Sequence, residues 1–135
     1  MGSLSRGDFE RWLEAYRRAW EDADADAVVE LFTEDAIYRS SPFHEPHVGS
    51  DAIHAYWSRA VGGQTERRVL IGRPIVEDDR AAAEWWTTFV DSQGEPATLP
   101  GILFLRFGPG RRCVELREAW SREPGIRPPH DGWGS

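Results

Sequence analysis

The first third of the chain carries apolar residues at the spacing of amphipathic helices. From Asp8 onward they recur every three or four positions and share one face, whereas charged residues occupy the other. A second, shorter helix is predicted to begin at Asp24 or Asp26, because either carboxylate can cap its first turn. Ser50 is a good N-cap for a third helix that runs to Val61. The apolar face of the first helix consists of Phe9, Trp12, Leu13, Tyr16 and Trp20.

After the third helix the pattern changes to alternation. Apolar and polar residues alternate over runs separated by turns that contain Gly, Pro or Asp, which predicts consecutive antiparallel hairpins. A bend is expected where Gly72 and Pro74 interrupt the first run. Together with a short strand before the third helix, the predicted strands are 36–40, 67–77, 81–91, 98–107 and 112–121. Helices first and strands later predict an α+β fold, with three N-terminal helices packed on a curved, mostly antiparallel sheet that forms a cone-shaped pocket.

The composition limits the kinds of function that the chain can have. A length of 135 residues predicts one domain over residues 8–122, with a flexible arm over 1–7 and a Pro/Gly-rich tail over 123–135. The single Cys113, with no signal-peptide pattern, predicts a cytoplasmic protein, and no run is apolar enough for a membrane partner. A net charge of −7 argues against nucleic acid as a partner. The absence of Lys excludes Schiff-base chemistry, and we expect no cofactor.

Residues 31–57, LFTEDAIYRSSPFHEPHVGSDAIHAYW, together with the order of the elements and the phrase Glu118-Ala119-Trp120-Ser121, resemble the nuclear transport factor 2-like superfamily. That superfamily includes ketosteroid isomerases, SnoaL-type polyketide cyclases and limonene-epoxide hydrolases. The resemblance covers residues 8–122 and is specific for the fold, whereas members with this pattern carry out different reactions. It therefore implies the cone-shaped fold without naming a reaction.

The resemblance to ketosteroid isomerases can be followed residue by residue. It implies that Tyr16 stands where those enzymes place an oxyanion donor, and that Ser40 stands where they place the general base. Because a Ser hydroxyl cannot take a proton from carbon without a base to activate it, ketosteroid isomerase activity is not expected. The second oxyanion donor becomes Leu103, the supporting tyrosines become Phe32 and Trp57, and the pocket Trp is kept as Trp120.

The resemblance also implies which side chains face the pocket. On the sheet these are Glu84, Trp86, Thr88, Leu103, Leu105, Leu116, Glu118 and Trp120. Trp85, Phe89 and Phe107 would then lie on the outer face, which suits a homodimer formed through that face. The Trp-rich walls predict a small, bulky, apolar ligand. The complete set of expected ligand contacts is Trp20, Phe32, Tyr38, Ser40, Trp57, Trp86, Thr88, Leu103, Leu116 and Trp120.

Four residues are candidates for catalysis. Glu84 and Glu118 could form a carboxylate pair that serves as acid and base, or could instead pair with arginines at the rim of the pocket. Tyr16 could donate a hydrogen bond to the ligand or be a core residue, and His44 could be a lone acid or base. We expect no metal, because the histidines and carboxylates between residues 44 and 54 match no ligand spacing.

Three functions fit these residues. The first is a small-molecule binding or enzyme-like domain with an aromatic cone-shaped pocket, whose polar contacts come from Tyr16, Ser40, His44, Glu84 and Glu118. The second is a lyase, cyclase, isomerase or epoxide hydrolase that uses Glu84, Glu118 or His44 as the base and Tyr16 as the donor. The third is a non-catalytic dimeric association domain that fills its own pocket with Trp. An empty cavity would exclude the third function, and an acid or base within that cavity would favour the second.

Overall fold

The computed structural model describes residues 4–135, so residues 1–3 of the predicted N-terminal arm (1–7) lie outside the described part. Three helices come first along the chain, as predicted. They are α1 (Arg6–Glu21), α2 (Ala25–Glu30) and α3 (Ser50–Val61). None of the helices within residues 4–135 has the length and apolar character that a membrane crossing needs.

Local capping interactions set where the helices begin. α1 starts before the predicted Asp8, because the Ser5 hydroxyl accepts the backbone N–H of Asp8 while the Asp8 carboxylate accepts that of Ser5. Asp24 caps α2, which settles the choice between the two predicted aspartates. Gly49 rather than Ser50 is the N-cap of α3, and no side chain caps that helix, so the predicted cap is wrong by one position.

The strands form one curved, mixed sheet in the order β2-β1-β7-β6-β5-β3, with β4 paired to β5 and β8 paired to β6. All pairs are antiparallel except β1 with β7, which the prediction of consecutive hairpins did not include. A single 3-10 turn (Pro109–Arg111) joins β6 to β7. The strands are β1 (Phe32–Arg39), β2 (His47–Val48), β3 (Thr65–Ile71), β4 (Ile75–Glu77), β5 (Arg80–Val90), β6 (Pro96–Phe107), β7 (Cys113–Trp120) and β8 (Glu123–Pro124).

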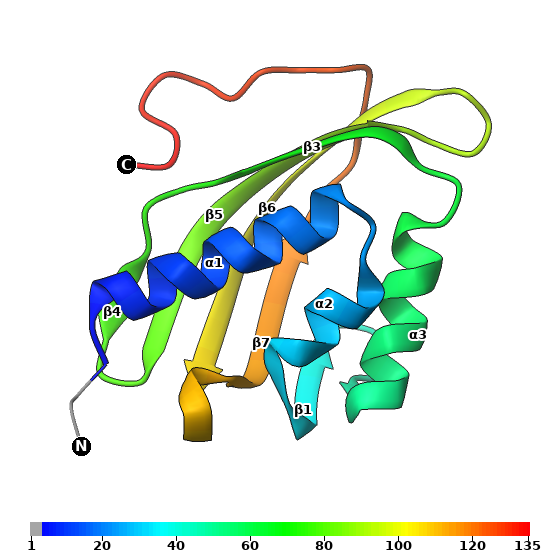
Figure 1. The fold of residues 1–135 in the computed structure, drawn as a ribbon. Helices are drawn as coiled ribbons and strands as arrows, with labels where there is room; N and C mark the ends of the chain where they lie inside the picture. The colour runs from blue at the N-terminus through cyan, green and yellow to red at the C-terminus, as the bar shows by residue number, and fades with distance from the viewer. Residues whose placement is uncertain (1–3) are drawn as a thin grey trace.

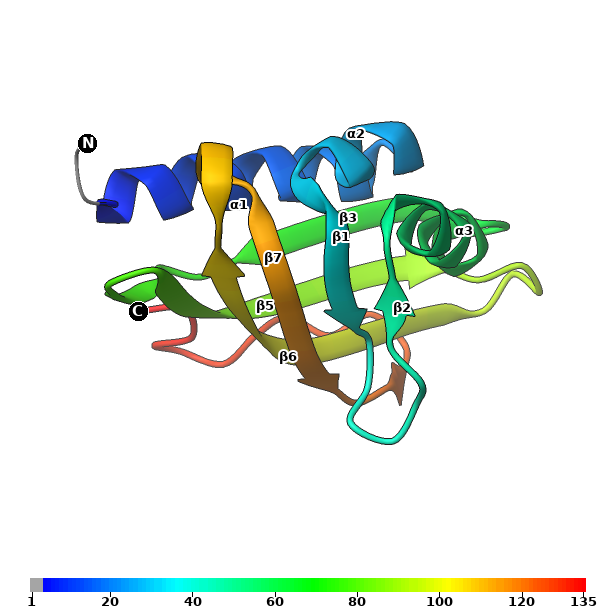
Figure 2. The same cartoon turned by 90° about the horizontal axis from the view of Figure 1, so that it is seen from below.

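The helices cover the concave face of the sheet, and the C-terminal tail crosses the opposite face (Figure 1, Figure 2). α1 lies across the sheet and packs on it through aromatic rings. Phe9 stacks on Phe107 with 4.2 Å between ring centroids, and Trp20 meets Trp85 edge to face at 5.0 Å. The predicted arrangement of three helices on a curved, mostly antiparallel sheet is therefore confirmed.

The expected inward face of β5 is wrong. Trp85 and Phe89 are buried on the helix side together with Thr87, whereas Glu84, Trp86 and Thr88 lie on the outer side. Because the side-chain period of a strand is two, an error of one position reverses the whole set. Phe107 was also expected on the outer face, and it is buried against Phe9 of α1. On β6 and β7 the expected inward face is confirmed for Leu103, Leu105, Leu116 and Glu118, which are all buried.

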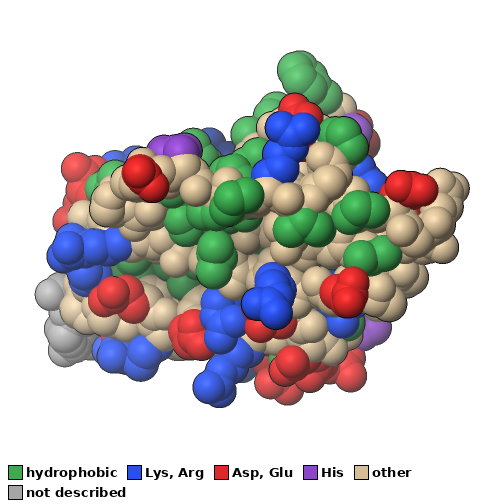
Figure 3. Space-filling view, turned by 90° about the horizontal axis from the view of Figure 1, so that it is seen from above, with side chains coloured by type: hydrophobic (Ala, Val, Ile, Leu, Met, Phe, Trp, Pro, Cys, Tyr) green, Lys and Arg blue, Asp and Glu red, His purple; other side chains and the backbone are tan. Residues whose placement is uncertain are grey.

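The tail is attached to the outer face of the sheet. Its β8 segment pairs with β6, and Trp86 of β5 donates its indole N–H to the carbonyl of Arg127 at 2.8 Å. Further along, Trp133 packs edge to face on Trp86, and the N–H of Gly134 donates to Glu84 at 3.0 Å. Figure 3 shows this side of the molecule, where apolar side chains are interspersed with charged ones. The tail therefore covers part of the outer face and leaves Trp86 only half-buried.

Gly101 of β6 makes room for Trp85, its partner on β5. A Cβ at position 101 would stand 2.4 Å from two ring carbons of Trp85, closer than any side-chain carbon can approach. We predict that Gly101→Ala lowers the free energy of unfolding by about 1–3 kcal/mol, because the indole must leave its position. Urea denaturation followed by fluorescence measures this change. Gly7→Ala, in α1 beside the flexible end of Arg11, is the control and should be neutral or stabilising.

Candidate functional site

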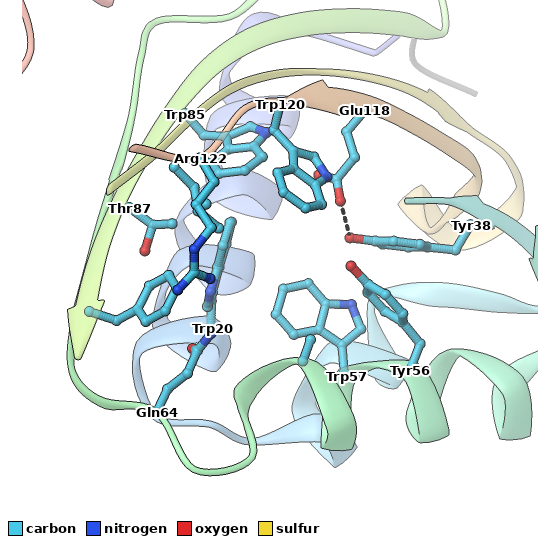
Figure 4. A pocket seen from close by; sticks show the side chains of 13 residues that line it. Trp20, Tyr38, Tyr56, Trp57, Gln64, Trp85, Thr87, Glu118, Trp120 and Arg122 are labelled. Carbon is cyan, nitrogen blue, oxygen red and sulfur yellow. Dashed lines mark hydrogen bonds between the residues drawn. The ribbon is translucent and has the colours of Figure 1, made fainter. Parts of the chain in front are cut away.

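A cavity of about 300 Å³ lies between α1, α3 and the concave face of the sheet (Figure 4). Its volume is at the lower end of the range for small-molecule sites, and its walls are mostly aromatic. The aromatic walls come from Trp20, Tyr38, Tyr56, Trp57, Trp85, Phe89 and Trp120. The polar residues of the lining are Gln64, Thr87, Glu118 and Arg122.

Glu118 of β7 is the buried carboxyl group of this cavity. Its side chain is only 8% exposed, one oxygen accepts a hydrogen bond from Tyr38, and Oε2 has no partner among the described residues. Burial raises the pKa of Glu118 from 4.5 to about 8, because a charged carboxylate is poorly solvated among aromatic rings, and the Tyr38 hydrogen bond offsets only part of this effect. Glu118 therefore retains its proton at neutral pH.

A chain of hydroxyl groups runs from α1 to Glu118. Tyr38 of β1 donates to Glu118 Oε1 at 2.8 Å, and the hydroxyls of Tyr16 and Tyr38 are 3.0 Å apart. Since the single Tyr38 proton is given to Glu118, Tyr16 must donate to Tyr38. Burial raises the pKa of Tyr16 and of Tyr38 well above the ordinary value, and the nearby Glu118 adds to the shift. Both tyrosines are fully buried and neutral, and they orient the carboxyl group.

His47 and Tyr56 lie beside this chain. The imidazole of His47 packs on the Tyr56 ring with 4.5 Å between centroids, and its Nε2 is 3.5 Å from the Ser40 hydroxyl. Burial lowers the pKa of His47, which favours the neutral imidazole. Burial also raises the pKa of Tyr56, so this hydroxyl stays protonated where it lines the cavity. β2 and α3 thus place two neutral polar side chains beside Tyr38 of the hydroxyl chain.

The end of the cavity away from Glu118 carries Arg122 and Gln64 (Figure 4). Arg122 donates to Asp91 at 3.1 Å, and its guanidinium lies over the ring of Phe89, 5.5 Å from the centroid. The pairing of Thr65 with Val90 places Gln64 next to the end of β5, from which Asp91 follows. Polar groups therefore stand at both ends of an aromatic cavity.

The predicted site residues are found in three places. Glu118 lines the cavity, and Tyr16 is joined to it through Tyr38. Glu84 is on the outer face, where it accepts a hydrogen bond from the tail, and His44 is exposed in the loop before β2. Of the predicted ligand contacts, those that line the cavity are Trp20, Tyr38, Trp57 and Trp120, those buried behind its wall are Phe32, Ser40, Leu103 and Leu116, and those on the outer face are Trp86 and Thr88.

The predicted pair of Glu84 and Glu118 is not formed. Glu118 pairs across the sheet with Leu103, which in turn pairs with Ala83, and directly opposed residues share a face. Glu84 is therefore on the other side of the sheet. The alternative in which Glu118 pairs with an arginine is also wrong, because Tyr38 is its one partner among the residues that the structure describes. Glu118 is a lone acid, not half of a carboxylate pair.

Several lining residues were not predicted, and a simple sequence signal was available for some of them. On β5 the charged Glu84 belongs to the set that includes Trp86 and Thr88, so polarity alone favours Trp85, Thr87 and Phe89 as the inward set. Tyr56 is adjacent to Trp57 on α3, and its exposure to the cavity depends on the angle of that helix. Gln64 and Arg122 carry no signal in the sequence, because they lie beyond the ends of the regular elements.

Residues 7–116 match the family described as the SnoaL-like domain. The chain belongs to this family. The match extends from α1 to the middle of β7, so it includes both tyrosines of the hydroxyl chain and ends just before Glu118. Among the described residues of this SnoaL-like protein, no three His, Cys, Asp or Glu side chains are grouped so that they could hold a metal ion.

Two solved structures are similar to this SnoaL-like protein over most of its length. One is the epoxide hydrolase/cyclase-like enzyme SalBIII, which has a role in pyran ring formation in the polyether salinomycin. It aligns with a TM-score of 0.73 and 20% identity over 83% of this chain and 89% of its own. The other, provisionally named an aromatic ring hydroxylase, comes from Novosphingobium aromaticivorans. Its TM-score is 0.73, with 20% identity over 89% of this chain and 92% of its own. At this identity the likeness shows a shared fold.

The raised pKa of Glu118 predicts a pH-dependent stability. Between pH 4.5 and about 8 the folded protein retains a proton that the unfolded chain releases, so folding stability falls as pH rises through this window. Relative to Glu118→Gln, which cannot ionise, we expect the wild type to lose about 1.4 kcal/mol for each pH unit inside the window. Urea denaturation at a series of pH values measures the difference. Glu84→Gln removes the same charge from the outer face and controls for net charge.

A difference between wild type and Glu118→Gln that stays constant from pH 5 to past pH 8 would show that the carboxyl is already ionised at pH 5.

Proposed function

We propose that this SnoaL-like protein is a cofactor-independent enzyme that opens an epoxide in a small, largely apolar substrate, with Glu118 as the general acid. The observation that carries the proposal is a neutral carboxyl group whose Oε2 has no partner and whose side chain lines an aromatic cavity. A proton on Oε2 can be donated to a substrate oxygen, because Oε1 already accepts the Tyr38 hydrogen bond. With a pKa of about 8, Glu118 is mostly protonated at neutral pH and can act as an acid.

Epoxide opening requires two proton transfers, one from Glu118 to the epoxide oxygen and one from the nucleophile back to Glu118. As the carbon–oxygen bond breaks, its electron pair stays on the epoxide oxygen, which takes the proton from Glu118 Oε2. A water molecule or a hydroxyl of the substrate forms the new carbon–oxygen bond and loses its own proton, which returns to the Glu118 carboxylate. Tyr38, fixed by Tyr16, stabilises the carboxylate in the interval between the two transfers.

The walls of the cavity support an apolar substrate. Aromatic rings from α1, α3 and the sheet surround the space, and rigid rings provide contact area with little loss of side-chain entropy. The likeness to SalBIII in fold supports epoxide chemistry over other acid-catalysed reactions, although it carries no residue assignment at 20% identity. The presence of the cavity also argues against an association domain that fills its own pocket.

The proposal is tested with styrene oxide, a small aromatic epoxide, by measuring diol formation with chiral chromatography. We expect Glu118→Gln to lower turnover by about 10²–10⁴-fold, because an amide cannot donate a carboxylic proton. The wild-type rate should fall as pH rises through about 8, where Glu118 loses its proton. Glu84→Gln is the matched control, since this carboxyl lies on the outer face, and its turnover should equal that of the wild type.

Equal turnover by Glu118→Gln and wild type would overturn the assignment of the acid, and racemic diol at the uncatalysed rate in the wild type would overturn epoxide opening.

We also propose a homodimer that forms through the outer face of the sheet. Apolar side chains remain exposed on that side of the molecule, namely Leu70 and Ile102 on the sheet and Ile126 in the tail. We expect a mass near twice 15.3 kDa by light scattering at micromolar concentration. Ile102→Arg would place a charge at the centre of the face and should shift the protein to the monomer. A monomeric wild type would contradict this interface.

A further inference from the structure

Polar atoms without partners mark the cavity. Four buried polar atoms that lack a hydrogen bond among the described residues belong to side chains that line it: Trp57 Nε1, Gln64 Oε1, Trp85 Nε1 and Glu118 Oε2. A buried polar group without a partner is costly, so native proteins rarely keep one without a ligand or an ordered water to pair with it. Because these side chains line one cavity, a ligand bound there can supply partners to those of the four atoms that do not face its wall.

The four atoms lie in different parts of the cavity: one faces its wall, and the others lie near its two ends. Trp85 Nε1 lies against the backbone of Gly101, so it faces the wall and not the centre of the cavity. Trp57 carries its indole nitrogen on the side that faces Tyr38 and Tyr56, close to the Glu118 end (Figure 4). Gln64 is at the opposite end, with Arg122. The acid end and the far end are thus separated by the aromatic rings.

The far end offers both a donor and an acceptor. Arg122 uses Nη2 for Asp91, and no other partner of its guanidinium is found in residues 4–135, so further N–H groups remain for a ligand. Gln64 Oε1 is a buried acceptor. Asp91 also fixes Arg122, because its other oxygen accepts the backbone N–H groups of Gln93 and Glu95. This end of the cavity is therefore preorganised.

A hydroxyl group fits this end better than a carboxylate does. The Asp91 carboxylate already compensates the charge of Arg122, and a second carboxylate would face the Gln64 oxygen with like charge. A hydroxyl can accept from Arg122 and donate to Gln64 at the same time. It can also pair with Gln64 if the amide is turned by 180°, since a hydroxyl both donates and accepts.

We infer that the substrate carries a second oxygen, a hydroxyl group, which binds between Gln64 and Arg122 while the reacting oxygen meets Glu118. The substrate class is a flat, mostly apolar molecule with an oxygen at each end, whose body packs against the aromatic rings that line the cavity. This inference rests on the proposed function, because it takes the cavity to be the substrate site. Gln64 is then a specificity-determining residue that takes no part in the chemistry.

The test uses two bicyclic ketones as probes, 1-tetralone and 6-hydroxy-1-tetralone, which differ only in the far hydroxyl. Isothermal titration calorimetry should show that the wild type binds the hydroxylated probe about tenfold more tightly, as one additional hydrogen bond to a charged group allows. Gln64→Met keeps the side-chain volume and removes the amide. We expect Gln64→Met to reduce the preference for 6-hydroxy-1-tetralone over 1-tetralone severalfold. Its affinity for 1-tetralone should equal that of the wild type.

Gln93→Met is the matched control, since Gln93 is exposed in the turn between β5 and β6, and it should keep the full preference. Equal binding of the two probes by wild type, a preference that Gln64→Met leaves intact, or no binding of either probe up to millimolar concentration would each overturn the inference. Its failure is distinguishable from that of the proposed function. The probes report binding alone, whereas styrene oxide turnover with Glu118→Gln reports chemistry alone.

Discussion

The packing of α1 across the concave face of the sheet is the contact on which the rest of the structure depends. Its first turns close one half of the concavity, where Phe9 stacks on Phe107 and Trp12 meets Phe32. Its last turn carries Trp20, which contacts both Trp57 and Trp85 and forms one wall of the open half. The cavity exists because the aromatic face of the helix fills only part of the curve of the sheet.

The carboxyl group of Glu118 lies in that open half, and its surroundings there favour the protonated form. Glu118 is surrounded by rings, and its one hydrogen bond within residues 4–135 comes from a neutral tyrosine, so none of the described cations stabilises the ionised form. The arginine that lines the cavity is at the other end and is already paired with Asp91. The same aromatic environment that favours an apolar ligand therefore also keeps the acid protonated.

Much of the fold could be predicted because its elements carry strong periodic patterns. The α1 face, the break at Gly72 and the successive strands of the second half are all visible in the sequence. The pairing of β1 with β7 was not, because it joins strands far apart in the chain that share no turn. Glu118 and Tyr16 were predicted from a resemblance that aligned β7 and α1 correctly. The same resemblance misplaced β5 by one position, since Trp85 and Trp86 make both faces of that strand apolar.

The hydroxyl chain has a consequence for how the acid exchanges its proton with solvent. Tyr16 is fully buried and gives its only proton to Tyr38, so the chain ends inside the core and does not reach the surface. The unpaired oxygen of Glu118 is itself enclosed, but the side chain that carries it lines the cavity, so a proton that arrives or leaves on this side passes through the cavity. A ligand that fills the cavity closes this route and isolates one proton together with the group that is to receive it.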